Sequence, residues 1–326
     1  MIKKLQFYVS ESLSPYINLA KEKILFDTVD SDTLILYLWQ NQNTVVIGKN
    51  QNIFSECRTE LLSKEGGTVA RRLSGGGAVF HDIGNLNFTF ICKSENLDTS
   101  KHMQVIQGAC RIAGIATELS GRNDILADGR KFSGNAFYNS KGTSYHHGTI
   151  LISADKEKMT RYLTPPKAKL ESKGVKSVRS RVINLTEINP HLTCEEMKAH
   201  LLLAFEAVYG LTPTEIEAID EARISALAEH YGRYEYLYEN SFPFDFVCKG
   251  RLSFGSVEIQ MQIKKGTVAA LRCYTDALDS ELPRKLESAL VSCQFEPQEL
   301  RKALAKTLSD TEATELYTLL EDQILS

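Results

Sequence analysis

RRLSGGGAVFHD, residues 71–82, is the stretch on which the predicted fold and chemistry depend. Three consecutive glycines stand between a pair of arginines and a short apolar run. Glycine lets the backbone approach a ligand closely and adopt positive φ, at an entropic cost that a simple connection does not require. Two guanidinium groups beside such backbone predict a site for an anion, such as a nucleotide phosphate or a carboxylate. The alternative is a glycine-rich surface loop with two solvated arginines.

The glycine-rich stretch fits neither of two common phosphate-binding patterns. It lacks the lysine and the hydroxyl residue that end the P-loop pattern G-x-x-x-x-G-K-[ST]. It also departs from the dinucleotide pattern G-x-G-x-x-G, because Phe80 stands where the last glycine belongs. We therefore predict a phosphate or carboxylate site of a different geometry.

The composition is that of an ordinary globular protein of 326 residues, with 43% hydrophobic and 24% charged residues. A chain of this length accommodates one large domain and one small domain. The formal net charge of -3 gives no global basic excess, so we expect no nucleic-acid partner. No apolar run reaches the roughly 18 to 20 residues that span a bilayer, and the first residues do not read as a signal peptide. We expect a cytoplasmic protein without a membrane partner.

The seven cysteines are scattered between Cys57 and Cys293 without a C-x-x-C spacing. Their odd number and their spacing predict reduced thiols that act mostly as small core residues in a cytosolic protein. We therefore expect neither a structural zinc site nor haem.

Hydrophobic periodicity and turn residues predict an α+β fold. We expect helices at 15–29, 52–63, 100–114, 155–163, 193–209 and 214–231, the fifth opened by a Thr193–Glu196 capping box. We expect strands at 33–39, 44–48, 69–73, 78–81 and 86–91, then a hairpin that turns at Asp128-Gly129 and a second that turns at 139–142.

The aromatic run 234–246 predicts a domain junction. Beyond it, alternating residues predict a strand pair, 257–263 and 268–274, that turns at Lys265-Gly266. Helices are expected at 279–290, 297–308 and 310–325. We predict a large domain, 1–245, of mixed β-sheets with flanking helices, and a small α+β domain, 246–326.

Lys131 is a candidate anion-binding residue. On a strand Lys131 and Phe132 face opposite sides, and Phe132 is the natural core residue. Ser133 and Gly134 are small enough to leave room for a ligand beside the lysine. A lysine against a phosphate or a carboxylate stays cationic, because the opposite charge offsets desolvation. The alternative is a solvated surface lysine.

Three more side chains near Lys131 in the sequence are candidates for binding. Asp124 either caps the hairpin or lies near phosphate and helps to hold Mg²⁺. His146 and His147 are adjacent on a strand and point to opposite faces, so they do not form a zinc site without a third ligand. His147 can instead shape a ligand pocket.

The segment 165–182 is rich in basic residues and carries one acid, Glu171. Composition alone favours a solvated loop. Its length without predicted structure also fits a mobile loop that closes over a nucleotide.

These motifs together resemble the lipoate–protein ligase family. The matching stretches are RRLSGGGAVFHDIGN (71–85), GRNDILADGRKFSGN (121–135), YHHGT (145–149) and GVKSVRSRVIN (174–184). The likeness extends from the N-terminus through the small C-terminal domain, and the central motifs show no departure from the family pattern. It implies a catalytic domain related to biotin ligases and class II aminoacyl-tRNA synthetases. It also implies a C-terminal accessory domain that changes position during the reaction.

The resemblance implies an ATP-dependent reaction in two steps. The lipoate carboxylate attacks the α-phosphate of ATP, which enters with Mg²⁺, and gives lipoyl-AMP and pyrophosphate. A lysine of an acceptor lipoyl domain then takes the lipoyl group and releases AMP. The implied acceptors are 2-oxoacid dehydrogenase E2 subunits or the glycine cleavage H protein, and we expect the ligase to be a monomer.

The resemblance also implies roles for individual residues. Lys131 is the matching catalytic lysine, which contacts both the lipoate carboxyl and the α-phosphate. The ATP phosphates are assigned to Arg72 and to the backbone of Gly77, Ala78, Val79 and Phe80. The lipoate side is assigned to Ser74, Gly75, His81 and His147. The loop that covers the adenylate contains Lys176, Ser177, Arg179 and Arg181.

Three alternatives to this ligase remain open. One is an ATP-independent lipoyl or octanoyl acyltransferase that uses a cysteine thioester. No cysteine falls between Asp124 and Arg181, although Cys92 and Cys110 lie near in the sequence. The others are a biotin ligase and a non-catalytic homologue that binds lipoyl domains.

Overall fold

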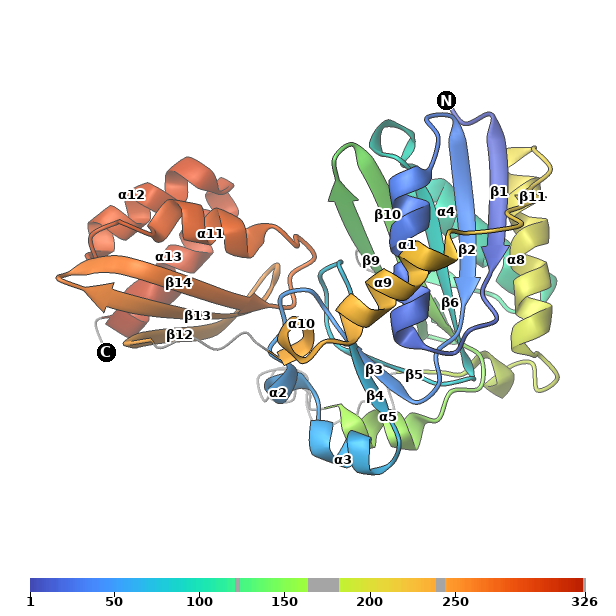
Figure 1. Ribbon diagram of the computed structural model, residues 1–326, viewed down its shortest axis with the longest axis horizontal. Helices are drawn as coiled ribbons and strands as arrows, with labels where there is room; N and C mark the ends of the chain where they lie inside the picture. Colours follow the sequence, from blue (N-terminus) through green and yellow to red (C-terminus); the bar gives the residue numbers. More distant parts are fainter. Residues whose placement is uncertain (121–123, 164–181, 239–243, 325–326) are drawn as a thin grey trace. The chain divides into compact units, whose positions relative to one another are not determined.

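The computed structural model describes residues 1–120, 124–163, 182–238 and 244–324, in two compact units (Figure 1). Unit 1 comprises Met1–Val46, Cys57–Arg71 and Val79–Leu237. Unit 2 comprises Ile47–Glu56, Arg72–Ala78 and Tyr238–Ser326. The boundary after residue 245 stays a prediction. The sequence did not predict that the glycine-rich loop, Arg72–Ala78, and the segment Ile47–Glu56 group with the C-terminal residues.

Unit 1 is built on an eight-stranded sheet with the order β11-β1-β2-β6-β10-β9-β8-β7. The β1 strand pairs in parallel with β2 and β11, and the other pairs are antiparallel. The strands are β1 (Lys4–Val9), β2 (Thr33–Trp39), β6 (Asn85–Lys93), β7 (Glu118–Ser120), β8 (Asp124–Ala127), β9 (Arg130–Ser140), β10 (Thr143–Leu151) and β11 (Thr214–Glu215). This mixed sheet confirms the predicted α+β class.

Helices cover both faces of the sheet (Figure 1). On one face α4 (Thr99–Ile112) packs against α8 (Cys194–Tyr209), and on the other α1 (Pro15–Thr28) packs against α9 (Glu221–Gly232). All seven residues of β2 are buried, because alternate side chains enter two different hydrophobic clusters. The Thr193–Glu196 capping box opens α8 as predicted. The shared β2 strand therefore anchors both layers of unit 1.

A second sheet of unit 1 has the order β4-β3-β5. Its strands are β3 (Thr44–Ile47), β4 (Thr68–Arg71) and β5 (Val79–His81). The short helices of the chain are α2 (Ile53–Glu56), α3 (Thr59–Lys64), α5 (Lys156–Tyr162) and α10 (Tyr234–Tyr238) among the described residues, and two 3-10 turns are η1 (Ser94–Asn96) and η2 (Leu185–Glu187).

Two helix predictions were wrong in extent. The helix predicted at 52–63 is interrupted between α2 and α3, because Cys57 forms a β-bridge with Leu163 and the Arg58 amide donates to the Tyr162 carbonyl. The helix predicted at 214–231 begins only at Glu221. The residues before it include β11, whose parallel pairing with β1 replaces helical hydrogen bonds.

The C-terminal part of unit 2 is a three-stranded antiparallel sheet with three helices over its apolar face. The strands are β12 (Phe246–Leu252), β13 (Gly255–Lys264) and β14 (Thr267–Thr275), and the helices are α11 (Leu282–Leu290), α12 (Pro297–Thr307) and α13 (Asp310–Ile324). Lys265 and Gly266 have φ of 53° and 76°, which confirms the predicted tight turn. The sequence did not predict β12.

Within the described residues, no helix combines the length and the apolar character that crossing a bilayer requires.

A pair of buried histidines lies in the core between α4 and the sheet. The Nδ1 atoms of His102 and His146 lie 3.3 Å apart, and His102 stacks on Phe90 with ring centroids 4.3 Å apart. Burial lowers the pKa of His102 from 6.5 to about 3, and burial also brings the pKa of His146 well below 6.5. Both imidazoles are therefore neutral in the folded protein near pH 7.

The depressed pKa of His102 makes the free energy of unfolding depend on pH. Below pH 6.5 the unfolded chain binds a proton at this residue that the folded chain does not bind until about pH 3, so stability falls as the pH falls through this window. We expect His102→Asn, which keeps a donor but does not titrate, to reduce this slope by up to about 1.4 kcal/mol per pH unit. Urea unfolding followed by the fluorescence of Trp39, the single tryptophan, measures it. The exposed His191→Asn is the control, and equal slopes in both variants would contradict the prediction.

Candidate functional site

Lys131 lies near the start of β9, directly after the tight turn at Asp128-Gly129 that the sequence predicts. Its Nζ is 2.7 Å from an Asp124 carboxylate oxygen on β8. The two side chains are 39% and 42% exposed, so a ligand can reach the pair from solvent. The neighbouring Phe132 is fully buried, which confirms the predicted alternation. The Asp124 carboxylate contacts the lysine side chain.

Gly134 provides the space over which Lys131 lies. A Cβ atom at position 134 would be 2.9 Å from the Lys131 Nζ and 3.0 Å from its Cε. Real Cβ atoms do not approach heavy atoms this closely, so any larger residue moves the end of the lysine side chain. The sequence prediction of room beside Lys131 is thus explained by Gly134 itself.

The backbone of Lys131 is held by a segment later in the chain. Its carbonyl accepts a hydrogen bond of 3.0 Å from the Ile183 amide, and Lys131 forms a parallel bridge with Val182. Glu187 accepts hydrogen bonds from Arg130 at 3.1 Å and from Lys156 at 2.5 Å. Burial raises the pKa of Glu187, but these donors and the Asn184 amide outweigh it and lower the pKa to about 2. The start of β9 is therefore fixed on two sides.

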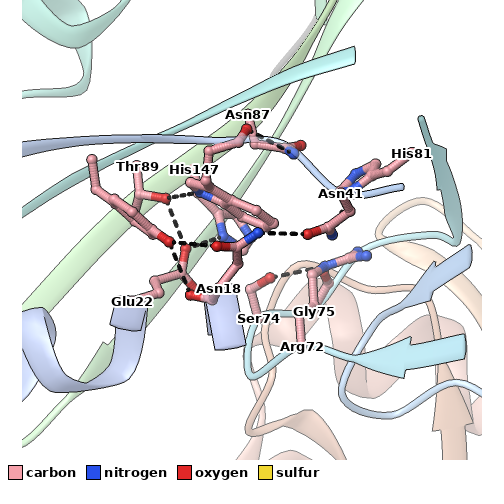
Figure 2. Close-up of polar contacts among 12 residues, drawn as sticks. Asn18, Glu22, Asn41, Arg72, Ser74, Gly75, His81, Asn87, Thr89 and His147 are labelled. Atoms are coloured by element: carbon pink, nitrogen blue, oxygen red, sulfur yellow. Dashed lines mark hydrogen bonds and ion pairs between the residues drawn. The ribbon is translucent and has the colours of Figure 1, made fainter. Parts of the chain in front are cut away.

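A buried polar group spans three neighbouring strands and α1 (Figure 2). Glu22 accepts a hydrogen bond of 2.8 Å from the Thr89 hydroxyl, and its carboxylate lies 2.9 Å from His147 Nδ1. The Trp39 indole donates to Thr89 at 3.1 Å. Glu22 is 2% exposed and His147 is 6% exposed. His147 is thus held in a defined orientation on the face opposite His146, as the strand alternation predicts.

Glu22, Trp39 and Thr89 are members of this group that the sequence did not indicate. The usable signal was an acid, Glu22, among the apolar residues of α1 that face the core. A buried carboxylate requires partners, but the sequence does not show that they lie on β6 and β10.

A second buried chain of polar contacts joins Asn18, Asn41 and His81 (Figure 2). The Asn18 Nδ2 lies 2.9 Å from the Asn41 Oδ1, and the Asn41 Nδ2 lies 3.1 Å from the His81 Nδ1. Both asparagines are fully buried and His81 is 3% exposed. His81 is in β5, where it pairs with Thr44, and Phe80 beside it contacts the Tyr162 ring. Of the predicted ATP-binding residues in unit 1, Phe80 is therefore a core residue and Val79 is half-buried.

The remaining predicted residues of the glycine-rich stretch belong to unit 2. The Arg72 guanidinium donates to the Gly75 carbonyl at 2.7 Å, to the Gly77 carbonyl at 2.8 Å and to the Ser74 hydroxyl at 3.0 Å. Gly76 has a φ of 88°, and its amide donates to the Ala277 carbonyl at 3.1 Å. Arg72 thus stabilises the conformation of its own loop. The sequence analysis expected both arginines to face a ligand and did not predict this role.

The adjacent Arg71 has a structural contact of its own, because its guanidinium donates to the Leu237 carbonyl at 2.7 Å. The loop residues assigned to the adenylate cover, Lys176, Ser177, Arg179 and Arg181, lie outside the described residues. Among the residues that the structure does describe, no three His, Cys, Asp or Glu side chains come together as a possible metal site.

Removal of the Glu22 carboxylate tests how much its contacts with Thr89 and His147 stabilise the folded protein. We expect Glu22→Ala to lower the free energy of unfolding by about 2 kcal/mol or more, because Thr89 and His147 lose their buried acceptor. Glu22→Gln has the same shape and keeps an acceptor oxygen, so its cost should be clearly smaller. Urea titrations that monitor Trp39 fluorescence compare the variants. Equal costs for Ala and Gln would show that volume, and not the acceptor, matters at this position.

Comparisons with known proteins identify relatives over most of the chain. The family "Lipoyl protein ligase A/B catalytic domain" matches residues 14–206, and "Bacterial lipoate protein ligase C-terminus" matches residues 241–320. The chain is 37% identical to "Lipoate-protein ligase A" of Bdellovibrio bacteriovorus, over 93% of this chain and 92% of that protein. It is 34% identical to the protein of the same name from Psychrobacter cryohalolentis, over 91% of each.

Solved structures give a consistent result. The crystal structure of P. falciparum LipL1 in complex with lipoate has a TM-score of 0.84 at 28% identity and covers 96% of this chain and 98% of that chain. A lipoate-protein ligase A bound with ATP has a TM-score of 0.60 at 25% identity and covers 72% of this chain and 98% of that chain.

Proposed function

Because the chain belongs to the lipoate–protein ligase family, we infer that it is an ATP-dependent ligase that attaches lipoate to proteins. The two relatives named "Lipoate-protein ligase A" align over more than nine-tenths of the chain. The observation that carries the inference in this molecule is Lys131, which is half-exposed beside Asp124 and lies over Gly134.

The reaction that we propose has two balanced steps. A lipoate carboxylate oxygen attacks the α-phosphorus of ATP, the bond to the leaving phosphate breaks, and lipoyl-AMP and pyrophosphate form. The amine of an acceptor lysine then attacks the acyl carbon, AMP leaves with the former carboxylate oxygen, and the amine loses a proton as the amide forms. The first step brings two anions to bonding distance, so fixed positive charge must offset their repulsion.

We assign that charge to Lys131. Its ammonium has three donors on a compact charge and no acceptor, so it can contact a carboxylate oxygen and an α-phosphate oxygen together. Asp124 is the partner that holds the side chain in place before the ligands bind. The contacts at Ile183, Arg130 and Glu187 fix the strand that carries the lysine.

The other site residues keep the roles that the motifs imply. We propose that Arg72 and the backbone of Gly77, Ala78, Val79 and Phe80 hold the ATP phosphates. Ser74, Gly75, His81 and His147 are assigned to the lipoate side, and Lys176, Ser177, Arg179 and Arg181 to a cover over the adenylate. The hydrogen bonds from Arg72 to the loop carbonyls support the backbone part of this proposal, because they fix the loop conformation before a ligand binds.

We propose that Mg²⁺ enters with ATP as part of that substrate. Mg²⁺ in such sites is held mainly by phosphates and water, with one or two carboxylates from the protein. The half-exposed carboxylate of Asp124 fits this requirement.

The acceptor and the setting of the reaction remain proposals as well. We propose that the acceptors are lipoyl domains of 2-oxoacid dehydrogenase E2 subunits or the glycine cleavage H protein. We also propose that a monomer acts in the cytoplasm, and that residues 1–245 bind lipoate and ATP while 246–326 form the accessory domain.

The thiols do not favour the alternative acyltransferase. An acyl-thioester mechanism requires an accessible cysteine with a lowered pKa. Cys92 and Cys110 are fully buried, and burial raises the pKa of each to about 12. Neither thiol can supply a thiolate near neutral pH.

Substitution of Lys131 tests the assigned role. We expect Lys131→Ala to abolish lipoate-dependent exchange of labelled pyrophosphate into ATP while the unfolding transition stays within about 1 kcal/mol of wild type, because the ion pair is exposed. Gly134→Ala keeps the lysine but displaces its end, so exchange should fall at least about tenfold. A glycine that leaves open space, changed as Gly142→Asn, is the matched control and should leave exchange unchanged. Unchanged exchange in Lys131→Ala would refute the role.

A further inference from the structure

The orientation of the buried Asn18 amide is fixed by its neighbours. Its Nδ2 lies 2.9 Å from the Ser12 carbonyl and 2.8 Å from the Gln40 carbonyl, which can only accept. Its Oδ1 accepts from the Ser10 hydroxyl at 2.7 Å and from the Tyr37 hydroxyl at 3.2 Å. The reversed amide would place its oxygen against two carbonyl oxygens. Asn18 therefore turns its amide nitrogen toward Asn41, and the two N–H groups are shared among the two carbonyls and Asn41 Oδ1.

The orientation passes from Asn18 to His81 through Asn41. Since Asn18 presents Nδ2, the facing atom of Asn41 is Oδ1, and Asn41 Nδ2 then faces His81 Nδ1 at 3.1 Å. A donor opposite Nδ1 requires that this nitrogen accept. A neutral imidazole with an unprotonated Nδ1 carries its proton on Nε2.

The series of hydrogen bonds that leads to His81 begins at Lys21, whose ammonium group can only donate. The Lys21 ammonium, in a residue that is 8% exposed, donates to the Ser10 hydroxyl at 3.2 Å, and this hydroxyl donates to Asn18. One series of hydrogen bonds therefore runs in a single direction, from Lys21 through Ser10, Asn18 and Asn41 to His81. Hydrogen bonds aligned in one direction polarise one another and strengthen the arrangement.

We propose that Asn18 and Asn41 are positioning residues that hold His81 in the neutral tautomer with its proton on Nε2, so that the ring offers one donor to the lipoate carboxylate. The carboxylate has only acceptor atoms, and the other tautomer would present a lone pair to it. The Trp39 ring lies edge-on to the imidazole, with ring centroids 5.9 Å apart, and limits the rotation of the imidazole. The assignment of the carboxylate as the acceptor rests on the proposed function, whereas the tautomer does not.

The tautomer can be measured directly by nitrogen NMR of the free, full-length protein. Long-range proton–nitrogen correlation separates protonated from unprotonated ring nitrogens, and the signals missing from His81→Gln assign His81 among the seven histidines. We expect an unprotonated Nδ1 and a protonated Nε2 near pH 7. A protonated Nδ1 would overturn the proposal, and this wild-type result does not depend on whether any Asn41 variant folds.

Asn41→Asp replaces the donor opposite Nδ1 with a carboxylate that accepts, so we expect a neutral His81 ring with Nδ1 protonated and Nε2 unprotonated. Asn43→Asp is the matched control, because Asn43 contacts the Glu65 carbonyl and lies outside the chain to His81. It should leave the His81 signals as in wild type. An unprotonated Nδ1 in Asn41→Asp would overturn the proposal.

Kinetics separate the positioning role from a structural one. We expect Asn41→Asp to lower kcat/KM for lipoate at least about tenfold, with KM for ATP unchanged, because one hydrogen bond to a charged acceptor is lost. Asn43→Asp should keep wild-type values. A shifted tautomer with an unchanged kcat/KM for lipoate would overturn the donation to lipoate. A wild-type protein that has the expected tautomer but makes no lipoyl-AMP would instead overturn the proposed ligase function.

Discussion

The contact between Lys131 and Asp124 is the interaction on which the proposed chemistry depends. A single compact cation must meet two anions, and its position is set before they arrive. Gly134 leaves the space in which the lysine side chain lies, and the hydrogen bond from Ile183 fixes the backbone below it. Preorganisation of this kind lowers the barrier, because the protein need not reorganise as charge develops.

The buried polar groups of unit 1 also fix side chains before a ligand binds, through hydrogen bonds to two histidines. Glu22 holds one nitrogen of His147, while Asn18 and Asn41 determine which nitrogen of His81 accepts. Such groups are costly to bury unless each donor and acceptor is satisfied. The contacts with Glu22 and Asn41 limit the rotation of the two imidazoles.

Local signals in the sequence predicted much of the fold. The apolar alternation of β13 and β14 and the turn at Lys265-Gly266 were sufficient to define that hairpin, and the Asp128-Gly129 turn located Lys131 on its strand. The prediction of one helix over 52–63 was wrong because Cys57 pairs with Leu163, which lies far away in the sequence. Propensity cannot anticipate a tertiary contact that interrupts a helix.

The site was predictable where a motif is contiguous and not where partners are distant. The glycine-rich stretch and Lys131 stand out by composition, but Glu22 meets His147 across 125 residues. The bracing of the loop by Arg72 was also missed, because a guanidinium beside glycines suggests an external anion before it suggests the loop's own carbonyls. The direction of a hydrogen bond, as at Asn41, depends on the tertiary neighbours of the amide and not on the local sequence.

Mass spectrometry of an apo lipoyl domain tests the proposed function most directly. The domain is incubated with the wild-type protein, lipoate, ATP and Mg²⁺, and a parallel reaction omits ATP. We expect the mass of one amide-linked lipoyl group on a single lysine, in the complete reaction only. Modification without ATP, or none in the complete reaction with any lipoyl domain offered, would contradict an ATP-dependent ligase.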